Sequence, residues 1–223
     1  MKNQTRTSEM TKKMTGIAAF SALAYGISLV TNIKVGFLSF DAKDAIITIA
    51  AFIYGPASAA IMSFITAFLE FISFGGTGPW GALMDFISTF SFTFTASIIY
   101  KYRRSLSGAL ISLGTAAILY VAVMMVANLL ITPLYMGVGV DAVKALIPTM
   151  LLPFNIAKAL MNSALVMLIY KPISKLTKRI GLTKTKSEPK SAGTYFTKDT
   201  IIMASVALGA MIVAIVIFVI LRK

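Results

Sequence analysis

The chain has 223 residues, of which 57% are apolar and only 13% are charged, and its mean hydropathy is +0.84. Soluble domains are about one quarter charged, so a surface that faces water throughout is excluded and lipid is the expected solvent. The absence of cysteine and histidine excludes disulfides, thiolate or imidazole catalysis and nearly every zinc site. The net charge of +13 does not indicate nucleic-acid binding, because the Lys and Arg residues gather at the ends of apolar runs, as the positive-inside rule describes.

Seven apolar runs follow one another after the basic segment 1–13, and they predict an all-α integral membrane protein. The expected helices cover about residues 14–31, 44–54, 56–74, 80–100, 108–131, 145–170 and 201–220. The fifth is expected to end at Thr132-Pro133, a loop is expected over Leu134–Lys144, and a basic linker separates the sixth run from the seventh.

The 31 residues from Asp44 to Phe74 fit either one long helix kinked at Pro56 or two short spans. As helix they extend roughly 46 Å, whereas two crossings of a ~30 Å hydrocarbon core need about 60 Å. Two spans place the N-terminus, Lys101–Arg104 and the linker 171–198 on one side, which then holds 15 of the 21 Lys and Arg residues. We therefore predict two short spans, with the basic side in the cytoplasm.

This orientation predicts an outer face made of the loop around Asp41, the loop Gly75–Pro79 and the loop Leu134–Lys144. Trp80 lies at that face, where an interfacial aromatic anchor is expected and stacking on a ligand is the alternative.

Polar residues inside the apolar runs gather in the predicted outer half. Asn155, Lys158 and Asn162 share one helix face at i, i+3 and i+7, just after Pro148 and Pro153, which remove backbone donors. A lysine at a helix centre costs roughly 2.5–3.5 kcal/mol on insertion scales, so this face is expected to line a polar pocket. Other polar residues expected near it are Asp41, Lys43, Asp44, Glu70, Asp85 and Asn128.

Several of these residues also have a purely structural interpretation. Asn128 and Asn162 can hydrogen-bond between helices as packing contacts, and Glu70 and Asp85 can pair with Lys158 or water. The expected pocket walls are Leu38, Phe40, Phe71, Tyr135 and Phe154. Amides, an ammonium and carboxylates beside such walls suit a small flat ligand with hydroxyl or carbonyl groups. No nucleophile–base pair is evident, so we predict no enzyme activity and no catalytic residues, cofactor or metal.

The first apolar run carries a stripe of small residues, Ala18, Ala22 and Gly26, at four-residue spacing. Such stripes let two helices approach closely. The stripe predicts either packing within the chain's own bundle or docking to another membrane subunit.

Five segments together resemble the S components of energy-coupling factor (ECF) transporters, and within that family the riboflavin-specific type. They are 37–44 (FLSFDAKD), 52–56 (FIYGP), 128–137 (NLLITPLYMG), 152–158 (LPFNIAK) and 170–172 (YKP). Each segment alone is a weak indication, but their order and spacing together make the resemblance to the family strong. The resemblance covers about residues 14–176. Asp85 departs from the resemblance, because a neutral Asn is expected there.

The resemblance implies a six-helix bundle with both ends in the cytoplasm and an outward-facing pocket gated by the first loop. It implies energy from a separate module of one membrane coupling protein and two ATPase subunits. Leu38, Phe40 and Asp41 match the gating loop, Asn128, Asn155 and Lys158 match positions for riboflavin recognition, and Ala18 and Ala22 match a docking motif.

The resulting prediction is a six-helix substrate-binding domain over 14–176, between a cytoplasmic segment 1–13 and a basic cytoplasmic linker 177–198, with an additional C-terminal transmembrane helix over 199–223. The expected localisation is the bacterial cytoplasmic membrane, and the expected cargo is riboflavin or a related flavin. The alternatives are an S component for FMN or another vitamin and a self-contained small-molecule transporter. The candidate substrate-binding residues are Leu38, Phe40, Asp41, Asp44, Glu70, Asp85, Asn128, Tyr135, Asn155, Lys158 and Asn162, and those for docking are Ala18, Ala22 and Gly26.

Overall fold

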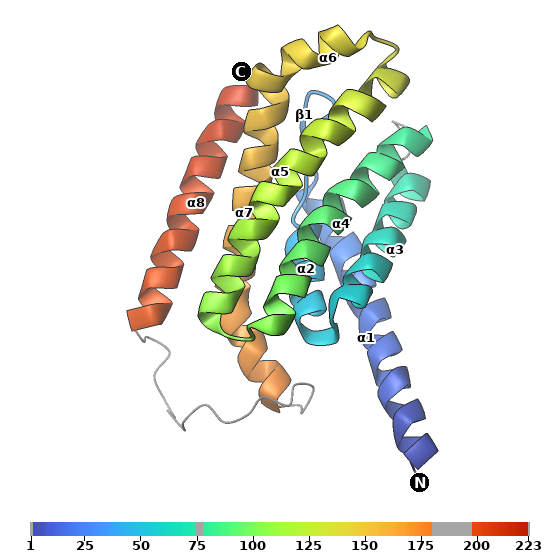
Figure 1. The fold of residues 1–223 in the computed structure, drawn as a ribbon, viewed down its shortest axis with the longest axis vertical. Helices are drawn as coiled ribbons and strands as arrows, with labels where there is room; N and C mark the ends of the chain where they lie inside the picture. The colour runs from blue at the N-terminus through green and yellow to red at the C-terminus, as the bar shows by residue number, and fades with distance from the viewer. Residues whose placement is uncertain (1, 75–77, 180–197, 223) are drawn as a thin grey trace.

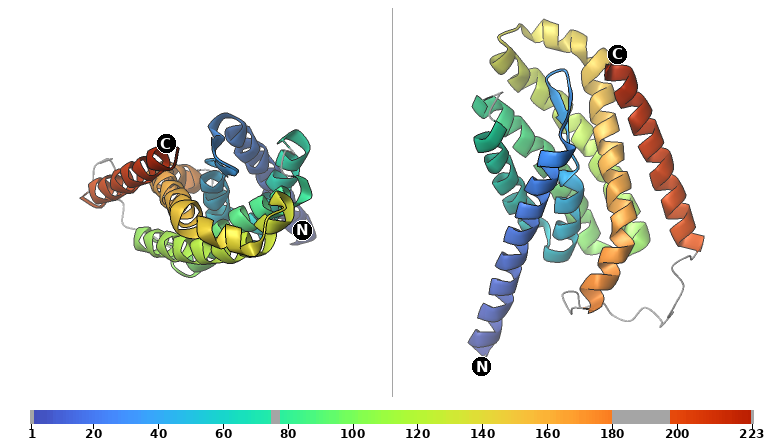
Figure 2. Two further views of the ribbon diagram at one scale, coloured as in Figure 1. Left: turned by 90° about the horizontal axis from the view of Figure 1, so that it is seen from above. Right: turned by 180° about the vertical axis from the view of Figure 1, so that it is seen from behind.

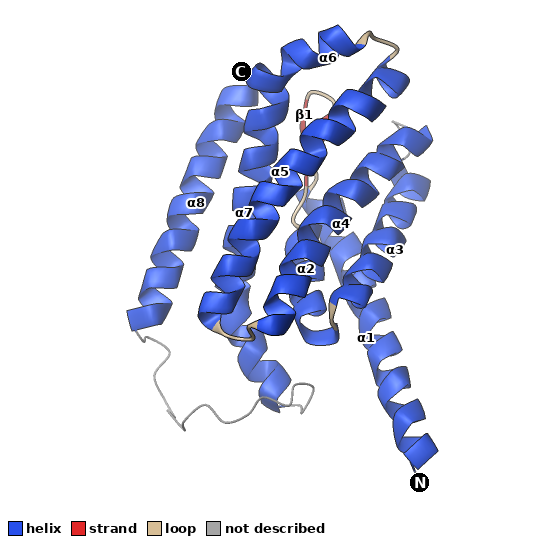
Figure 3. Cartoon of the chain, in the orientation of Figure 1, coloured by secondary structure: helices blue, strands red, loops and turns tan. Residues whose placement is uncertain are grey.

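A computed structural model of the chain describes residues 2–74, 78–179 and 198–222 (Figure 1). These residues form a bundle of helices with one short β-hairpin (Figure 3). The elements in chain order are α1 (Lys2–Thr31), β1 (Ile33–Val35), β2 (Leu38–Phe40), α2 (Lys43–Tyr54), α3 (Pro56–Phe74), α4 (Gly78–Tyr102), α5 (Leu106–Met136), α6 (Val140–Leu146), the π-helical turn η1 (Ile147–Leu151), α7 (Leu152–Arg179) and α8 (Lys198–Arg222).

Six of the described helical segments are long and apolar enough to cross a membrane, so the chain is a multi-pass membrane protein. They are Thr7–Thr31, Pro56–Ser73, Gly78–Tyr102, Leu106–Met136, Val140–Tyr170 and Ala204–Leu221. α2 has 12 residues and covers only about 18 Å. It therefore does not span a hydrocarbon core by itself, unlike the short span predicted there.

The chain reverses between α2 and α3 at Gly55, which confirms two separate elements in place of one kinked helix (Figure 2). Gly55 has a φ of 95°, a conformation that L side chains rarely adopt. Pro56 then opens α3, where its missing N–H would have had no helical partner. The Gly-Pro pair therefore explains both the end of α2 and the start of α3.

The predicted loop between α1 and α2 is an antiparallel hairpin, in which Ile33 pairs with Phe40 and Val35 with Leu38. Its two-residue turn begins at Gly36, whose φ of 60° suits such turns. A Cβ at Gly36 would collide with the side chain of Met150 in η1, so the turn lies directly against that segment. The hairpin stands above α2, in the same part of the bundle as α6 and η1 (Figure 2).

The region between the fifth and sixth predicted spans differs from expectation. α5 does not end at Thr132-Pro133 but continues through Pro133 to Met136, and it ends at Gly137 with a left-handed C-cap whose N–H donates to the Pro133 carbonyl at 3.0 Å. Most of the expected loop Leu134–Lys144 is also helical, because α6 begins at Val140. Prolines are tolerated within membrane helices where neighbouring groups satisfy the freed carbonyls.

The termini and loops divide between two ends of the bundle. The hairpin turn, α6 and the end of α8 lie at one end, and the N-terminus and the α4–α5 connection lie at the other (Figures 1 and 2). The N-terminal turns of α1 project beyond the other helices, so the basic segment predicted as separate is helical from residue 2. The predicted linker lies largely outside the described residues.

Candidate functional site

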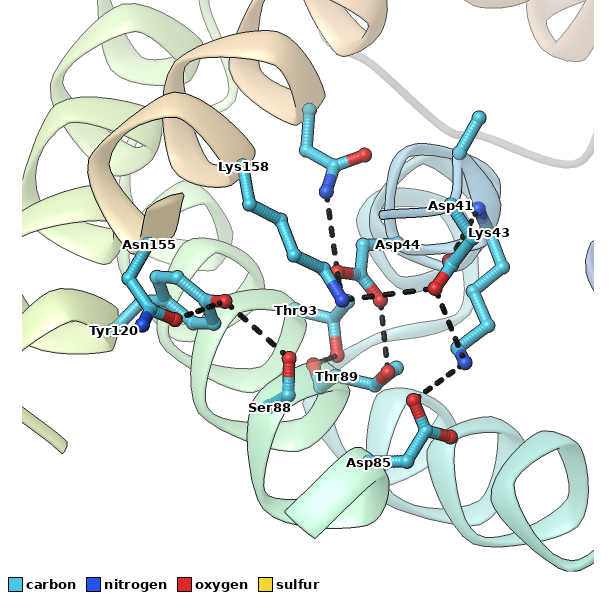
Figure 4. Close-up of polar contacts among 12 residues, drawn as sticks. Asp41, Lys43, Asp44, Asp85, Ser88, Thr89, Thr93, Tyr120, Asn155 and Lys158 are labelled. Carbon is cyan, nitrogen blue, oxygen red and sulfur yellow. Dashed lines mark hydrogen bonds and ion pairs between the residues drawn. The ribbon is translucent and has the colours of Figure 1, made fainter. Parts of the chain in front are cut away.

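A charged cluster lies inside the bundle, where α2, α4 and α7 meet (Figure 4), and α3 adds Glu70 to it. Its members come from positions far apart in sequence and are largely shielded from solvent. They are Asp41, Lys43, Asp44, Glu70, Asp85 and Lys158.

Lys43 binds three carboxyl groups and is fully buried at the start of α2. Its Nζ donates to Glu70 Oε2 of α3 at 2.7 Å and to Asp85 Oδ1 of α4 at 2.6 Å, and it lies 3.5 Å from Asp41 Oδ2. Glu70 and Asp85 therefore partner Lys43, and not Lys158 as the structural alternative had it. Although Asp41, Glu70 and Asp85 all face this lysine, no group of carboxyl side chains within the described ranges is arranged to hold a metal ion.

Lys158 reaches into the same cluster from α7. Its Nζ lies 3.6 Å from Asp41 Oδ2 and 4.0 Å from Asp44 Oδ2. Asp44 also accepts hydrogen bonds from Thr89 Oγ1 at 2.8 Å and from Asn162 Nδ2 at 3.2 Å. One aspartate therefore joins α2, α4 and α7.

Asp41 sits at the base of the hairpin and contacts both lysines. Burial alone would raise the pKa of Asp41, but the Lys43 and Lys158 ammonium groups and the Lys43 backbone N–H outweigh burial and hold that pKa below its ordinary value. Asp41 therefore stays ionised at neutral pH and fastens the end of the hairpin to α2 and α7.

Asn155 lies one turn from Lys158, as its predicted helix face requires, and its amide is oriented by two partners. The Tyr120 hydroxyl of α5 donates to Asn155 Oδ1 at 2.9 Å, and Asn155 Nδ2 donates to the Leu151 carbonyl of η1 at 2.7 Å. Because the Leu151 carbonyl can only accept, the NH₂ end of the Asn155 amide faces Leu151 and its oxygen faces the Tyr120 hydroxyl. One Nδ2 hydrogen remains for a further acceptor.

Asn128 belongs to a separate polar group, which lies nearer the C-terminal end of α5 than Tyr120. Its Nδ2 donates to the Met124 carbonyl at 2.7 Å, and its Oδ1 accepts from Thr132 at 3.0 Å. The ring of Tyr135 packs edge-on against Phe37 of the hairpin turn, with centroids 6.2 Å apart. These residues lie on the hairpin side of the bundle, and within the part of the chain that the structure describes Asn128 makes no hydrogen bond to the charged cluster.

Leu38 and Phe40 place the hairpin against α7. Phe40 is buried in an apolar group with Phe154 and Ala157, and Leu38 packs at its edge. The backbone of Phe40 leads directly into Asp41, so the hairpin joins the apolar group to the charged cluster.

Three oxygen atoms in and beside the charged cluster have no hydrogen-bond partner among the described residues: Glu70 Oε1, Asp85 Oδ2 and Asn162 Oδ1. Buried acceptors without donors are unfavourable by roughly 1–3 kcal/mol each. The carboxyl groups of the cluster also outnumber its lysines by two. This arrangement suits a neutral ligand that carries several hydroxyl or N–H donors.

Sequence reasoning missed Lys43 as a site residue and missed Thr89 and Tyr120 entirely. The sequence places Lys43 near the pocket but does not reveal its pairing with Glu70 and Asp85, because these partners lie 27 and 42 residues away and no local pattern connects them. Tyr120 lies within an apolar run and gives no polar signal of its own. A buried lysine beside two aspartates, in the sequence DAKD, was the available hint for Lys43.

The small-residue stripe of α1 faces away from the bundle. Ala18 and Ala22 are exposed, Gly26 has open space where a Cβ would lie, and the buried face of α1 consists of Ile17, Ser21, Ala24 and Ser28. The structure therefore does not use the stripe for packing within the described bundle.

Comparison with known proteins gives one consistent result. The model of the family described as the ECF transporter substrate-specific component matches residues 12–170. The riboflavin transporter RibU of Staphylococcus aureus (strain TCH60) is 26% identical over 181 residues, which cover 77% of this chain and 95% of the relative. The riboflavin transporter FmnP of Bacillus subtilis (strain 168) is 28% identical over 173 residues, which cover 71% and 90%.

The fold is also similar to a solved structure. The S component of a bacterial ECF transporter superposes with a TM-score of 0.65 at 26% identity, covering 76% of this chain and 99% of that chain. The family match ends at residue 170, so α8 lies beyond it.

Proposed function

Because the chain belongs to the family of ECF transporter substrate-specific components, we propose that its cargo is riboflavin, bound at the charged cluster and Asn155 under the hairpin. The observation that carries this proposal is the set of three buried oxygen atoms, of Glu70, Asp85 and Asn162, that have no hydrogen-bond partner among the described residues and so suit a ligand able to donate hydrogen bonds. The two relatives named as riboflavin transporters align over 95% and 90% of their own lengths, which supports the same cargo.

The site matches both halves of riboflavin. The ribityl chain carries hydroxyl donors for the unpaired oxygens of Glu70, Asp85 and Asn162. The isoalloxazine ring has an apolar body, which suits Leu38 and Phe40, and a polar edge, which suits the remaining N–H of Asn155 and the ammonium of Lys158. Riboflavin enters this proposal as cargo, and the site has no catalytic group, cofactor or metal assigned to it.

The charges of the cluster favour riboflavin over FMN. A phosphate would lie beside more carboxylates than lysines, and Lys43 is already held by Glu70, Asp85 and Asp41. Like charges within a few ångströms in a buried site repel strongly. FMN should therefore bind more weakly than riboflavin.

Transport requires further subunits, since the family is described as the substrate-specific component of the ECF transporter. We assign that role to a membrane coupling protein with two ATPase subunits, and we assign the docking surface to Ala18 and Ala22 on the outward face of α1.

Fluorescence quenching of riboflavin by the purified protein tests the cargo. The fluorescence of micromolar riboflavin should be quenched on binding, and FMN and unrelated vitamins should displace riboflavin only weakly. Lys158→Ala should weaken binding by at least tenfold, because it removes a buried charge-assisted donor. Lys144→Ala is the matched control, since Lys144 is exposed on α6 and its ion pair among the described residues is with the exposed Asp141. Absence of quenching, or equal affinity in Lys158→Ala and Lys144→Ala, would reject this site for riboflavin.

A further inference from the structure

α8 packs along α7 through a heptad-like seam. Its inward residues follow spacings of four, three, four and three: Ala207, Met211, Ala214, Phe218 and Leu221. Ala207 and Ala214 are fully buried, whereas Ile212, Val213, Ile215 and Val216 on either side of Ala214 are exposed. Such a pattern is typical of two helices that pack side by side over several turns.

The facing surface of α7 is equally specific. Phe154, Ala157 and Met161 form one buried group with Ala214, and the partly buried Phe218 packs against it. Alanine on both helices permits close approach, which is how helices associate where lipid supplies no hydrophobic driving force. α8 runs antiparallel to α7, so its last turns reach the end of the bundle that carries the hairpin (Figures 1 and 2).

Phe218 extends this contact to the hairpin. Its ring centroid lies 5.1 Å from that of Phe40 and 5.5 Å from that of Phe154, with interplanar angles of 58° and 78°. Phe40 is the residue before Asp41, which is bound to Lys43 and Lys158. The three rings therefore connect α8, the hairpin and α7 at a point one residue from the charged cluster.

We propose that Phe218 is a positioning residue, which holds Phe40 and so keeps the β1–β2 hairpin seated over the charged cluster. α8 lies outside the region that the family model matches, so the family does not assign this role. The ligand part of the inference rests on the proposed function: a hairpin held in this way slows the release of bound riboflavin.

Release kinetics test the ligand part. In the full-length Phe218→Ala variant, the riboflavin dissociation rate should rise about tenfold, because two favourable ring contacts are lost, while the association rate changes much less. Val219→Ala is the matched control, since Val219 is 54% exposed on the same turn of α8. Phe40→Ala combined with Phe218→Ala should release riboflavin no faster than Phe40→Ala alone. Equal rates in Phe218→Ala and Val219→Ala, or additive effects in the double variant, would overturn the proposal.

A ligand-free measurement separates this inference from the cargo assignment. The chain contains no cysteine, so Ser39→Cys introduces a single thiol on β2. Its rate of maleimide labelling should increase when Phe218→Ala is added, and also when Ala214→Leu pushes α8 away from α7 without altering Phe218. Failure of the wild-type protein to bind riboflavin would reject the cargo but leave this test intact. Unchanged labelling in both variants would reject the role of Phe218.

Discussion

At the scale of single residues, Tyr120 illustrates how an apolar-looking position can control a binding group. Its hydroxyl is the donor that holds Asn155 Oδ1, and the chain supplies no other hydrogen-bond partner to that atom within the described residues. Tyr120→Phe keeps the ring and removes the donor. We expect riboflavin to bind about fivefold more weakly, since one such hydrogen bond contributes about 1 kcal/mol.

A double-mutant cycle distinguishes this effect from general loosening of the bundle. In the Asn155→Ala background, Tyr120→Phe should leave the riboflavin affinity measured by quenching unchanged. An equal loss of affinity in both backgrounds would mean that Tyr120 does not act through Asn155.

Lys43 offers a test of stability at the same scale. Lys43→Met leaves Asp41, Glu70 and Asp85 buried without their shared cation, so the free energy of unfolding should fall by about 3–5 kcal/mol. Adding Glu70→Gln and Asp85→Asn should restore much of it. Thermal unfolding followed by circular dichroism in detergent checks both steps, with Lys144→Met as the exposed control. No recovery in the triple variant would contradict the role of Lys43 as a charge partner.

Sequence reasoning succeeded at residues whose signal is local. Asn155, Lys158 and Asn162 follow the helical period, so their common buried face could be predicted. Lys43 and Thr89 could not be assigned in the same way, because their roles depend on contacts between α2, α3 and α4 that arise only when the helices pack.

At the scale of secondary-structure elements, α1 presents its small residues outward and so predicts where the coupling partner binds. The combined variant Ala18→Trp and Ala22→Trp should retain riboflavin affinity and lose both co-purification with the coupling module and uptake into cells, because bulky rings prevent close helix approach. Leu23→Trp is the matched control, since Leu23 is exposed on another side of α1. Loss of riboflavin binding in the double tryptophan variant would instead indicate misfolding. Intact uptake in that variant would place the docking surface elsewhere.

The element boundaries show which sequence signals are decisive. Gly55-Pro56 correctly separated α2 from α3, because glycine there adopts a positive φ and proline suits a first turn. Pro133 was wrongly predicted to end α5, because a membrane helix tolerates an internal proline, and α5 ends at the left-handed Gly137. The hairpin was missed as a pair of strands, since each strand has three residues and too little alternation to detect.

At the scale of the whole molecule, the polar groups of the bundle are distributed asymmetrically. The charged cluster and Asn155 lie below the hairpin, whereas the opposite end is packed with rings such as Phe52 and Tyr100, whose centroids are 4.0 Å apart. The sequence predicts that the polar groups gather at one end of the bundle, and the structure places them at the end that carries the hairpin. A substrate-binding subunit that admits its cargo from one side and closes the other requires such an arrangement.

The packing of α8 against α7 affects how α8, the last of the six spanning segments among the described residues, behaves over time. α8 is apolar enough to remain inserted in the bilayer whether or not it touches α7. Its separation from α7 is therefore not unfolding but the release of a tethered partner that stays in the same membrane. Such a partner has a high effective concentration, so a weak contact is enough to keep it bound most of the time. The chain thus carries a built-in competitor for any other helix that approaches the Phe154 face of α7.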